Sequence, residues 1–101
     1  MVSFDFIISS MHPCLEGHFP NNPIVPGVVI IDEIMQQVCI NEPTIKITNI
    51  PSVKFLKPLK ADTVVNVTVS EKNSGLYQFS CHIKEDLIVS GQLRIQVKKY
   101  K

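Results

Sequence analysis

The sequence predicts an α+β fold in which an antiparallel β-sheet wraps around one central helix. One segment, from Gly27 to about Ile40, has the apolar periodicity of a helix. Alternating segments joined by turn signals follow it to the end of the chain. The length of 101 residues fits a single domain, 1–101. A domain this small buries a modest share of its surface, so dimerisation would help to stabilise it.

The chain before the helix is predicted to be a strand and a long loop. Val2 to Ser9 alternates through Phe4, Phe6 and Ile8 and is typical of a strand. Residues 10–26 are rich in proline, which fixes its own φ and disfavours helix in the residue before it. We therefore expect a rigid, non-helical loop, and long loops in compact domains are often functional.

The helix is predicted to be wrapped by the sheet because its apolar arc is wide. At about 100° per residue, one arc holds Val28, Ile30, Ile31, Ile34, Met35, Val38 and Cys39. Glu33 and Gln37 fall in the middle of the remaining polar arc, whereas Asp32 and Gln36 fall at its margin. Asn41 and Pro43 are expected to end the helix.

Strands are predicted for most of the remaining chain. Pro51 is expected to break one strand, and Pro58 to end the next. A turn is expected at Asn73-Ser74-Gly75 and another at Glu85-Asp86. The predicted strands are 44–50, 53–56, 63–70, 76–84 and 87–98.

Composition excludes several classes of protein. A net charge of +1 argues against general nucleic-acid binding. No apolar run approaches the ~20 residues of a membrane span, and the N-terminus lacks the basic region of a signal peptide. The spacing of Cys14, Cys39 and Cys81 fits neither a disulfide framework nor a zinc site, so we expect reduced thiols in a cytoplasmic protein. Neither a phosphate loop nor a serine-nucleophile elbow is present, and we expect no metal or cofactor.

The most specific motif spans Glu16 to Gln37. Asp32 lies fourteen residues after His18, and the fixed positions between and around them are Gly17, Phe19, Pro20, Pro23, Pro26, Gly27, Val28 and Gln36. This pattern resembles the signature of the β-hydroxyacyl-acyl carrier protein dehydratases of the hot-dog fold. The later segment 54–58, Lys-Phe-Leu-Lys-Pro, looks like the strand that follows the helix in that family. The resemblance implies dehydration of a (3R)-hydroxyacyl-[acyl carrier protein] to the trans-2-enoyl product, in fatty acid or polyene/polyketide-type biosynthesis.

In this resemblance, His18 and Asp32 are the catalytic residues. An imidazole titrates near neutral pH, which suits His18 as the base, and Asp32 would be the acid. Desolvation beside the apolar arc favours a raised pKa for Asp32, whereas the helix dipole opposes it, and the sequence does not decide between them. The alternative for Asp32 is a solvated acid that stabilises the first turn. Aspartate in place of the more common glutamate also leaves isomerase activity open.

The substrate-binding residues implied by the resemblance are Gly27, Phe19 and Gln36. The backbone N–H of Gly27 would bind the thioester carbonyl at the helix N-terminus. Gln36, one helical turn after Asp32, is expected to hydrogen-bond and orient its carboxyl group. The alternatives are a simple hinge at Gly27 and an ordinary polar helix residue at Gln36.

The partners implied by the resemblance are an acyl carrier protein and a second copy of the chain. In that family the active site lies across a homodimer, with the histidine from one subunit and the acid from the other. Lys54, Lys57 and Lys60 form a basic cluster that suits docking of an acidic carrier protein, or is an ordinary solvated face. Two further functions stay open, a hot-dog acyl thioesterase and a non-catalytic acyl- or carrier-binding subunit.

Overall fold

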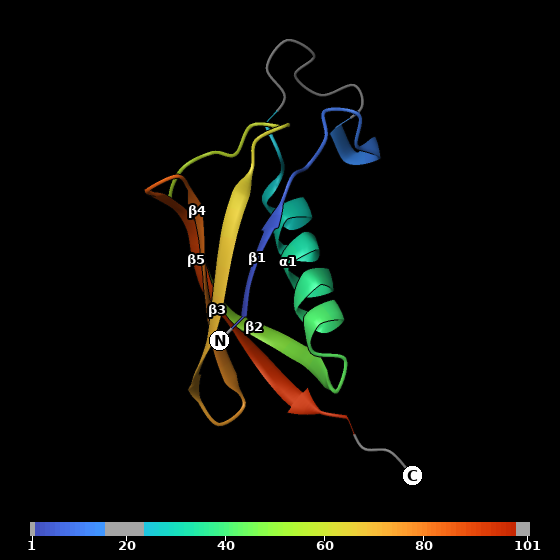
Figure 1. The fold of residues 1–101 in the computed structure, drawn as a ribbon, viewed down its shortest axis with the longest axis vertical. Helices are drawn as coiled ribbons and strands as arrows, with labels where there is room; N and C mark the ends of the chain where they lie inside the picture. The colour runs from blue at the N-terminus through green and yellow to red at the C-terminus, as the bar shows by residue number, and fades with distance from the viewer. Residues whose placement is uncertain (1, 16–23, 99–101) are drawn as a thin grey trace.

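The computed structural model of the protein describes residues 2–15 and 24–98, and its elements follow the predicted order (Figure 1). A short 3₁₀ turn, η1, lies in the predicted loop. The elements are β1 (Val2–Phe6), η1 (Pro13–Leu15), α1 (Gly27–Asn41), β2 (Ile45–Phe55), β3 (Val65–Asn73), β4 (Leu76–Ile83) and β5 (Asp86–Val97).

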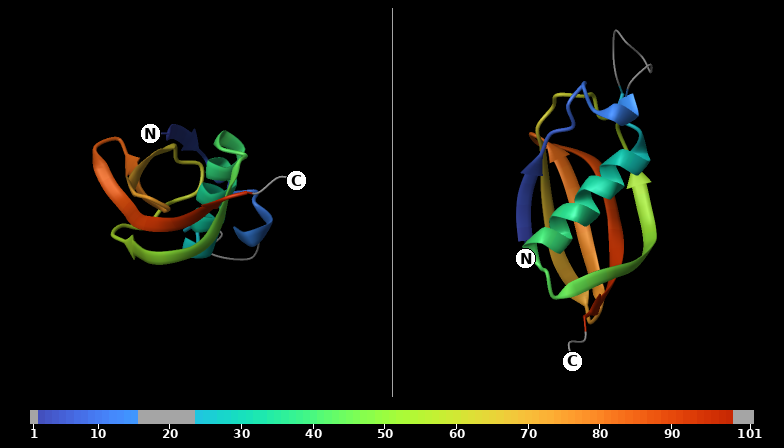
Figure 2. Two further views of the ribbon diagram at one scale, coloured as in Figure 1. Left: turned by 90° about the horizontal axis from the view of Figure 1, so that it is seen from below. Right: turned by 90° about the vertical axis from the view of Figure 1, so that its right-hand side faces the viewer.

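Within the described residues, five antiparallel strands form one sheet in the order β1-β3-β4-β5-β2. The sheet is strongly curved, and α1 lies in its hollow between the edge strands β1 and β2 (Figures 1 and 2). This arrangement confirms the predicted α+β fold with an antiparallel sheet around one helix.

The core lies between α1 and the concave face of the sheet. The helix contributes Ile30, Ile34 and Val38, each less than 5% exposed. The predicted inward face of β3, formed by Val65, Val67 and Val69, is confirmed. The other strands add the buried side chains Phe6, Ile45, Phe79, Cys81, Val89 and Leu93.

The predicted polar arc of the helix was wrong in its orientation. The exposed stripe of α1 consists of Val28, Asp32, Gln36 and Ile40, which recur every four residues. Val28 is 76% exposed, although its sequence pattern placed it on the apolar arc. The pattern assumed that every apolar side chain faces this chain's own core, whereas the sheet covers only one side of the helix.

Glu33 and Gln37, expected at the middle of the polar arc, are instead half-buried. Gln37 Nε2 donates a hydrogen bond to Glu33 Oε1 at 3.2 Å. This internal bond lowers the cost of partly removing the two polar groups from water.

Pro51 does not break the strand, contrary to expectation, because β2 continues from Ile45 to Phe55 as one element. The pairing of β2 with β5 changes register between Ile47 and Asn49 and again between Asn49 and Ser52. Proline has no N–H to donate, and sheets accept it at edges and bulges. Since β2 is an edge strand with irregular pairing at this point, both conditions are met.

The positions of two turns account for the bounds of the strands beside them. Gly75 adopts a φ of 78°, which confirms the turn predicted at 73–75. The next turn lies at Lys84 and Glu85, one residue earlier than predicted, and Lys84 adopts a φ of 55°. Asp86 is therefore the first residue of β5 rather than part of the turn.

Candidate active site

The start of α1 is held by the segment that follows β2. The backbone N–H of Val25 donates to the carbonyl of Leu59 at 2.8 Å, and Ile24 pairs with Lys60. Leu59 is 1% exposed, so this contact is part of the core. The helix then begins at Gly27, and the N–H groups of Val29 and Ile30 both donate to the carbonyl of Pro26. These hydrogen bonds fix the direction of the first helical turn. The backbone N–H groups at the start of a helix have no partner within the helix.

Gly27 lies against the ring of Phe55. A Cβ placed on Gly27 would be 2.7 Å from Cζ of Phe55, closer than side chains normally approach. The ring is 52% exposed and covers the start of the helix. Packing against Phe55 is therefore a further reason for glycine at this position, beside the hinge and the carbonyl-binding role considered from the sequence.

Asp32 and Gln36 form the hydrogen bond that their spacing predicted. Gln36 Nε2 donates to Asp32 Oδ2 at 2.7 Å, and both residues are exposed. The bond links one carboxylate oxygen to a residue on the next turn of the same helix. It restricts the rotation of the Asp32 carboxyl and leaves the other oxygen, Oδ1, available for a ligand.

Asp32 lines a largely apolar pocket of about 400 Å³ between α1 and β2, which we call the Asp32 pocket. Its volume and its few polar groups match the usual character of small-molecule sites. The lining residues are His12, Val28, Val29, Ile31, Asp32, Met35 and Ile50.

His12 is a polar member of this pocket, and the sequence motif does not include it. It is half-buried, and its carbonyl accepts a hydrogen bond from the N–H of Leu15 at 2.9 Å, in the turn η1. The loop is tied down by Asp62, whose N–H donates to the carbonyl of Ile8 and whose Oδ1 accepts from the N–H of Ser10. His12 and Asp32 are brought together by this tertiary contact, and no local spacing signals it.

The predicted base His18 and the predicted substrate contact Phe19 lie outside the described residues. Their positions relative to Asp32 therefore stay predictions.

The three lysines of the predicted basic cluster have different surroundings. Lys54 lines a shallow polar pocket of about 250 Å³ together with Ser52, Gln78, Ser90 and Gln92. Neighbouring strand residues point to opposite faces, so Lys54 faces away from the helix, whereas Phe55 faces its start. Lys57 Nζ lies 3.3 Å from Asp86 Oδ1, and both side chains are mostly exposed. Lys60 pairs with Ile24 at the start of the helix.

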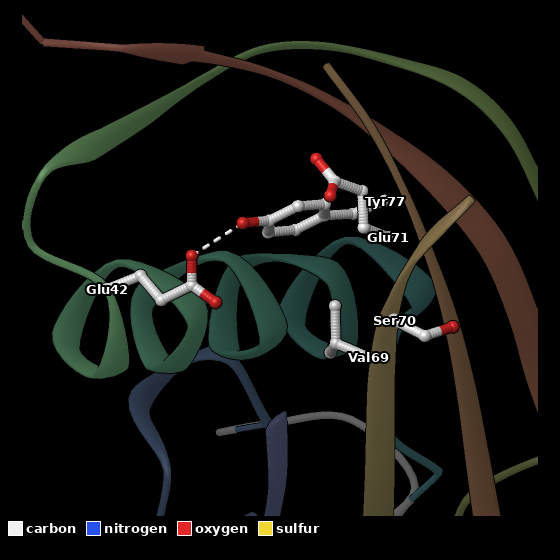
Figure 3. Close-up of a pocket in the computed structure, with 5 residues that line it drawn as sticks. All are labelled: Glu42, Val69, Ser70, Glu71 and Tyr77. Atoms are coloured by element: carbon white, nitrogen blue, oxygen red, sulfur yellow. Dashed lines mark hydrogen bonds between the residues drawn. The ribbon is translucent and has the colours of Figure 1, made fainter. Parts of the chain in front are cut away.

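Another, smaller pocket, which we call the Tyr77 pocket, lies at the C-terminal end of α1 (Figure 3). Tyr77 Oη donates a hydrogen bond to Glu42 Oε2 at 2.5 Å. Burial, and then the bond to Glu42, raise the pKa of Tyr77 to about 12. Glu42 follows Asp32 by ten residues, or ~15 Å of helix, so this pocket is separate from the Asp32 pocket.

The described residues contain neither a metal-binding cluster nor a membrane-spanning helix. In residues 2–15 and 24–98, no group of three or more histidine, cysteine, aspartate or glutamate side chains is arranged to hold a metal ion. None of the helices in that part of the chain is long and apolar enough to span a membrane. Cys39 and Cys81 are free thiols, as expected.

Residues 1–92 of the chain match the model of a protein family described as "ApeI-like: ApeI dehydratase". The 3-hydroxyacyl-[acyl-carrier-protein] dehydratase FabZ of Ehrlichia chaffeensis is 34% identical over 98 residues, which cover 86% of this chain and 68% of the relative. The chain thus spans about two thirds of the length of that relative.

The fold is shared with solved structures of other proteins, including a dehydratase complex and a thioesterase. The dehydratase heterocomplex ApeI:P from Xenorhabdus doucetiae matches with a TM-score of 0.78 at 22% identity, over 92% of this chain and 84% of that chain. A variant of the fluoroacetyl-CoA-specific thioesterase FlK, in complex with fluoroacetate and CoA, matches with a TM-score of 0.70 at 16% identity, over 97% of this chain and 89% of that chain. These matches confirm the expected hot-dog fold.

Proposed function

The chain belongs to the ApeI-like dehydratase family, and we propose that it removes water from a (3R)-hydroxyacyl chain carried by an acyl carrier protein. The product is the trans-2-enoyl thioester, as an intermediate of fatty acid or polyene/polyketide-type biosynthesis. The observation that supports this most directly is the position of Asp32, held by Gln36 in the wall of an apolar pocket beside the start of α1.

The proposed reaction uses two proton transfers. His18 takes the proton from C2, and the electrons of that C–H bond form the C2=C3 double bond. Asp32, in its protonated form, gives a proton to the C3 hydroxyl as the C–O bond breaks, and water leaves. The negative charge that develops on the thioester oxygen is stabilised by the backbone N–H of Gly27. His18 is the base because of its motif, and His12 is the rival because it lines the same pocket as Asp32.

We propose that two copies of the chain build each active site, with His18 from one and Asp32 from the other. Two features support this assembly. In the described part of the chain, no strand pairs with the outer edge of β2. The exposed stripe of α1 also carries the apolar side chains Val28 and Ile40, which a monomer would leave in water.

Lys54 is the better candidate for contacting an acidic carrier protein, because Lys57 is already paired with Asp86. We propose a cytoplasmic location, in line with an acyl carrier protein as the partner. The proposed chemistry needs no metal or cofactor.

The test is incubation of the protein with 3-hydroxyacyl-carrier protein, followed by mass spectrometry for the loss of one water. Asp32→Asn keeps the shape of the side chain but cannot supply the proton, so turnover should fall by ~10²–10⁴-fold. Glu85→Gln makes the same chemical change in an exposed turn and should leave turnover unchanged.

Lys54→Glu should weaken turnover of carrier-bound substrate more than turnover of a small thioester mimic.

The same assay separates the alternatives. His18→Ala should abolish water loss; loss of turnover in His12→Gln with full activity in His18→Ala would transfer the base to His12. Release of free thiol in place of water loss would support a thioesterase. Neither product, with binding retained, would support a non-catalytic acyl- or carrier-binding subunit.

A further inference from the structure

Met35 lies between two neighbouring pockets on the same flank of α1. It lines the Asp32 pocket and also a second pocket of about 380 Å³, which we call the distal pocket. Both pockets lie between α1 and β2. Besides Met35, the distal pocket is lined by Gln36, Cys39, Ile45, Lys46, Ile47 and Lys98.

The two pockets follow one another along the helix. From Val28 to Met35 the helix rises ~10 Å, and from Met35 to Cys39 it rises a further ~6 Å. Asp32 belongs to the first stretch, close to the helix N-terminus. A ligand whose reacting atoms lie at Asp32 and whose tail runs along the helix therefore meets Met35 before it reaches the distal pocket.

We propose that Met35 sets the acyl chain length that this enzyme accepts, and this inference rests on the proposed dehydratase function. With methionine present, the acyl tail fills the Asp32 pocket and ends at Met35, so chains short enough to end there are the preferred substrates. A smaller side chain at this position joins the two pockets and admits longer chains. Methionine suits a boundary of this kind, because its unbranched side chain packs adaptably against ligands of different shape.

The two pockets fit an acyl tail, and the second copy proposed above would cover them from outside. Each pocket has a volume within the usual range of small-molecule sites, and the Asp32 pocket has few polar groups. One of them is a carboxyl group oriented by Gln36, as expected for a site that acts on a ligand rather than one that only packs. The tail would continue from that carboxyl along Ile31 and Met35, which are half-buried in this chain.

The experiment compares kcat/KM for a series of 3-hydroxyacyl-carrier protein substrates of increasing chain length. Met35→Ala should raise the ratio of long-chain to short-chain kcat/KM by roughly 10-fold, and Met35→Phe should lower it, because small changes in an apolar pocket discriminate by about that factor. Val64→Ala is the matched control, since Val64 is an exposed apolar residue outside α1 and lines neither pocket. Circular dichroism and thermal melts establish whether each variant is folded. If Met35→Ala does not fold, the comparison of Met35→Phe with the parent protein tests the proposal.

Cys39 gives a second readout that does not depend on turnover. It lies in the distal pocket, whereas burial raises the pKa of the Cys81 thiol to about 12 and keeps it unreactive. In a Cys14→Ser background, a non-reacting long-chain acyl thioester should protect Cys39 from alkylation in Met35→Ala but not in the parent protein.

Two results would overturn the inference while leaving the dehydratase function intact. The first is an unchanged chain-length profile in both Met35 variants of an active enzyme. If the oligomeric state of these variants also changes, the distal pocket is assigned to contact between copies. The second is protection of Cys39 by the long-chain thioester in the parent protein. Absence of water loss from every substrate would instead overturn the proposed function itself.

Discussion

Two different factors favour glycine at position 27, at the start of α1, and they can be tested separately. The ring of Phe55 occupies the space that a side chain at position 27 would need. The proposed chemistry also needs a thioester oxygen to come close to the Gly27 N–H. Phe55 is half-exposed, so its ring has room to turn away from a methyl group.

For Gly27→Ala we therefore expect a change of less than about 1 kcal/mol in the free energy of unfolding, measured by urea denaturation. Turnover should fall by up to ~10²-fold, the scale of losing one oxyanion donor. The double variant Gly27→Ala/Phe55→Leu should stay impaired, because the methyl group still blocks the approach of the substrate. Full recovery in the double variant would show that glycine serves only to fit the ring.

The site residues differ in how far the sequence could predict them. The bond between Asp32 and Gln36 follows from residues four apart on one helix, and local geometry is sufficient to predict it. His12 reaches the same pocket through a loop tied to Asp62, fifty residues later in the sequence. A contact of that kind depends on tertiary structure, so no local pattern indicates it.

A side-chain hydrogen bond links the C-terminal end of α1 to β4. Tyr77 of β4 donates to Glu42, the C-cap residue of the helix (Figure 3). We expect Tyr77→Phe to lower the free energy of unfolding by roughly 1–2 kcal/mol at neutral pH. A double-mutant cycle with Glu42→Gln should show coupling between the two positions, and additive effects would contradict the contact.

The same bond predicts a dependence on alkaline pH. The folded protein holds the Tyr77 proton up to a pKa of about 12, whereas an unfolded tyrosine loses it near 10. Stability from Tyr77 is therefore fully present below pH ~10 and is lost as the pH rises toward ~12. The difference in unfolding free energy between wild type and Tyr77→Phe should shrink over that interval. Cys81 also titrates late, but it is present in both proteins and cancels in the difference.

At the scale of elements, periodicity predicted the kinds of element better than their surroundings. The helix bounds agree to within about a residue, because Gly27 and Asn41 are strong local signals. The predicted position of the exposed stripe of α1 was wrong, because periodicity does not show which apolar residues contact a ligand or a second copy instead of this chain's own core. Pro51 was misjudged because its effect depends on whether β2 lies at the edge of the sheet, and strand order is set by long-range pairing.

At the scale of the whole molecule, the exposed apolar surface and the proposed site occupy the same flank. Val28, beside Asp32 in the exposed stripe, lines the Asp32 pocket although it is 76% exposed. A second copy placed against this flank would cover Val28 and exclude water from the pocket. In this arrangement each active site forms only when two copies associate, and the isolated chain would hold only part of each site.

Mixing two inactive variants tests this central claim most directly. His18→Ala and Asp32→Ala proteins are dissociated, mixed in equal amounts and reassociated, and water loss from 3-hydroxyacyl-carrier protein is measured. If each site takes His18 from one copy and Asp32 from the other, about a quarter of the wild-type activity should return, because half of the dimers are mixed and each holds one intact site. Mixing His18→Ala with the double variant His18→Ala/Asp32→Ala should restore none. Absence of recovery in the first mixture, with subunit exchange verified by mass, would contradict the shared site.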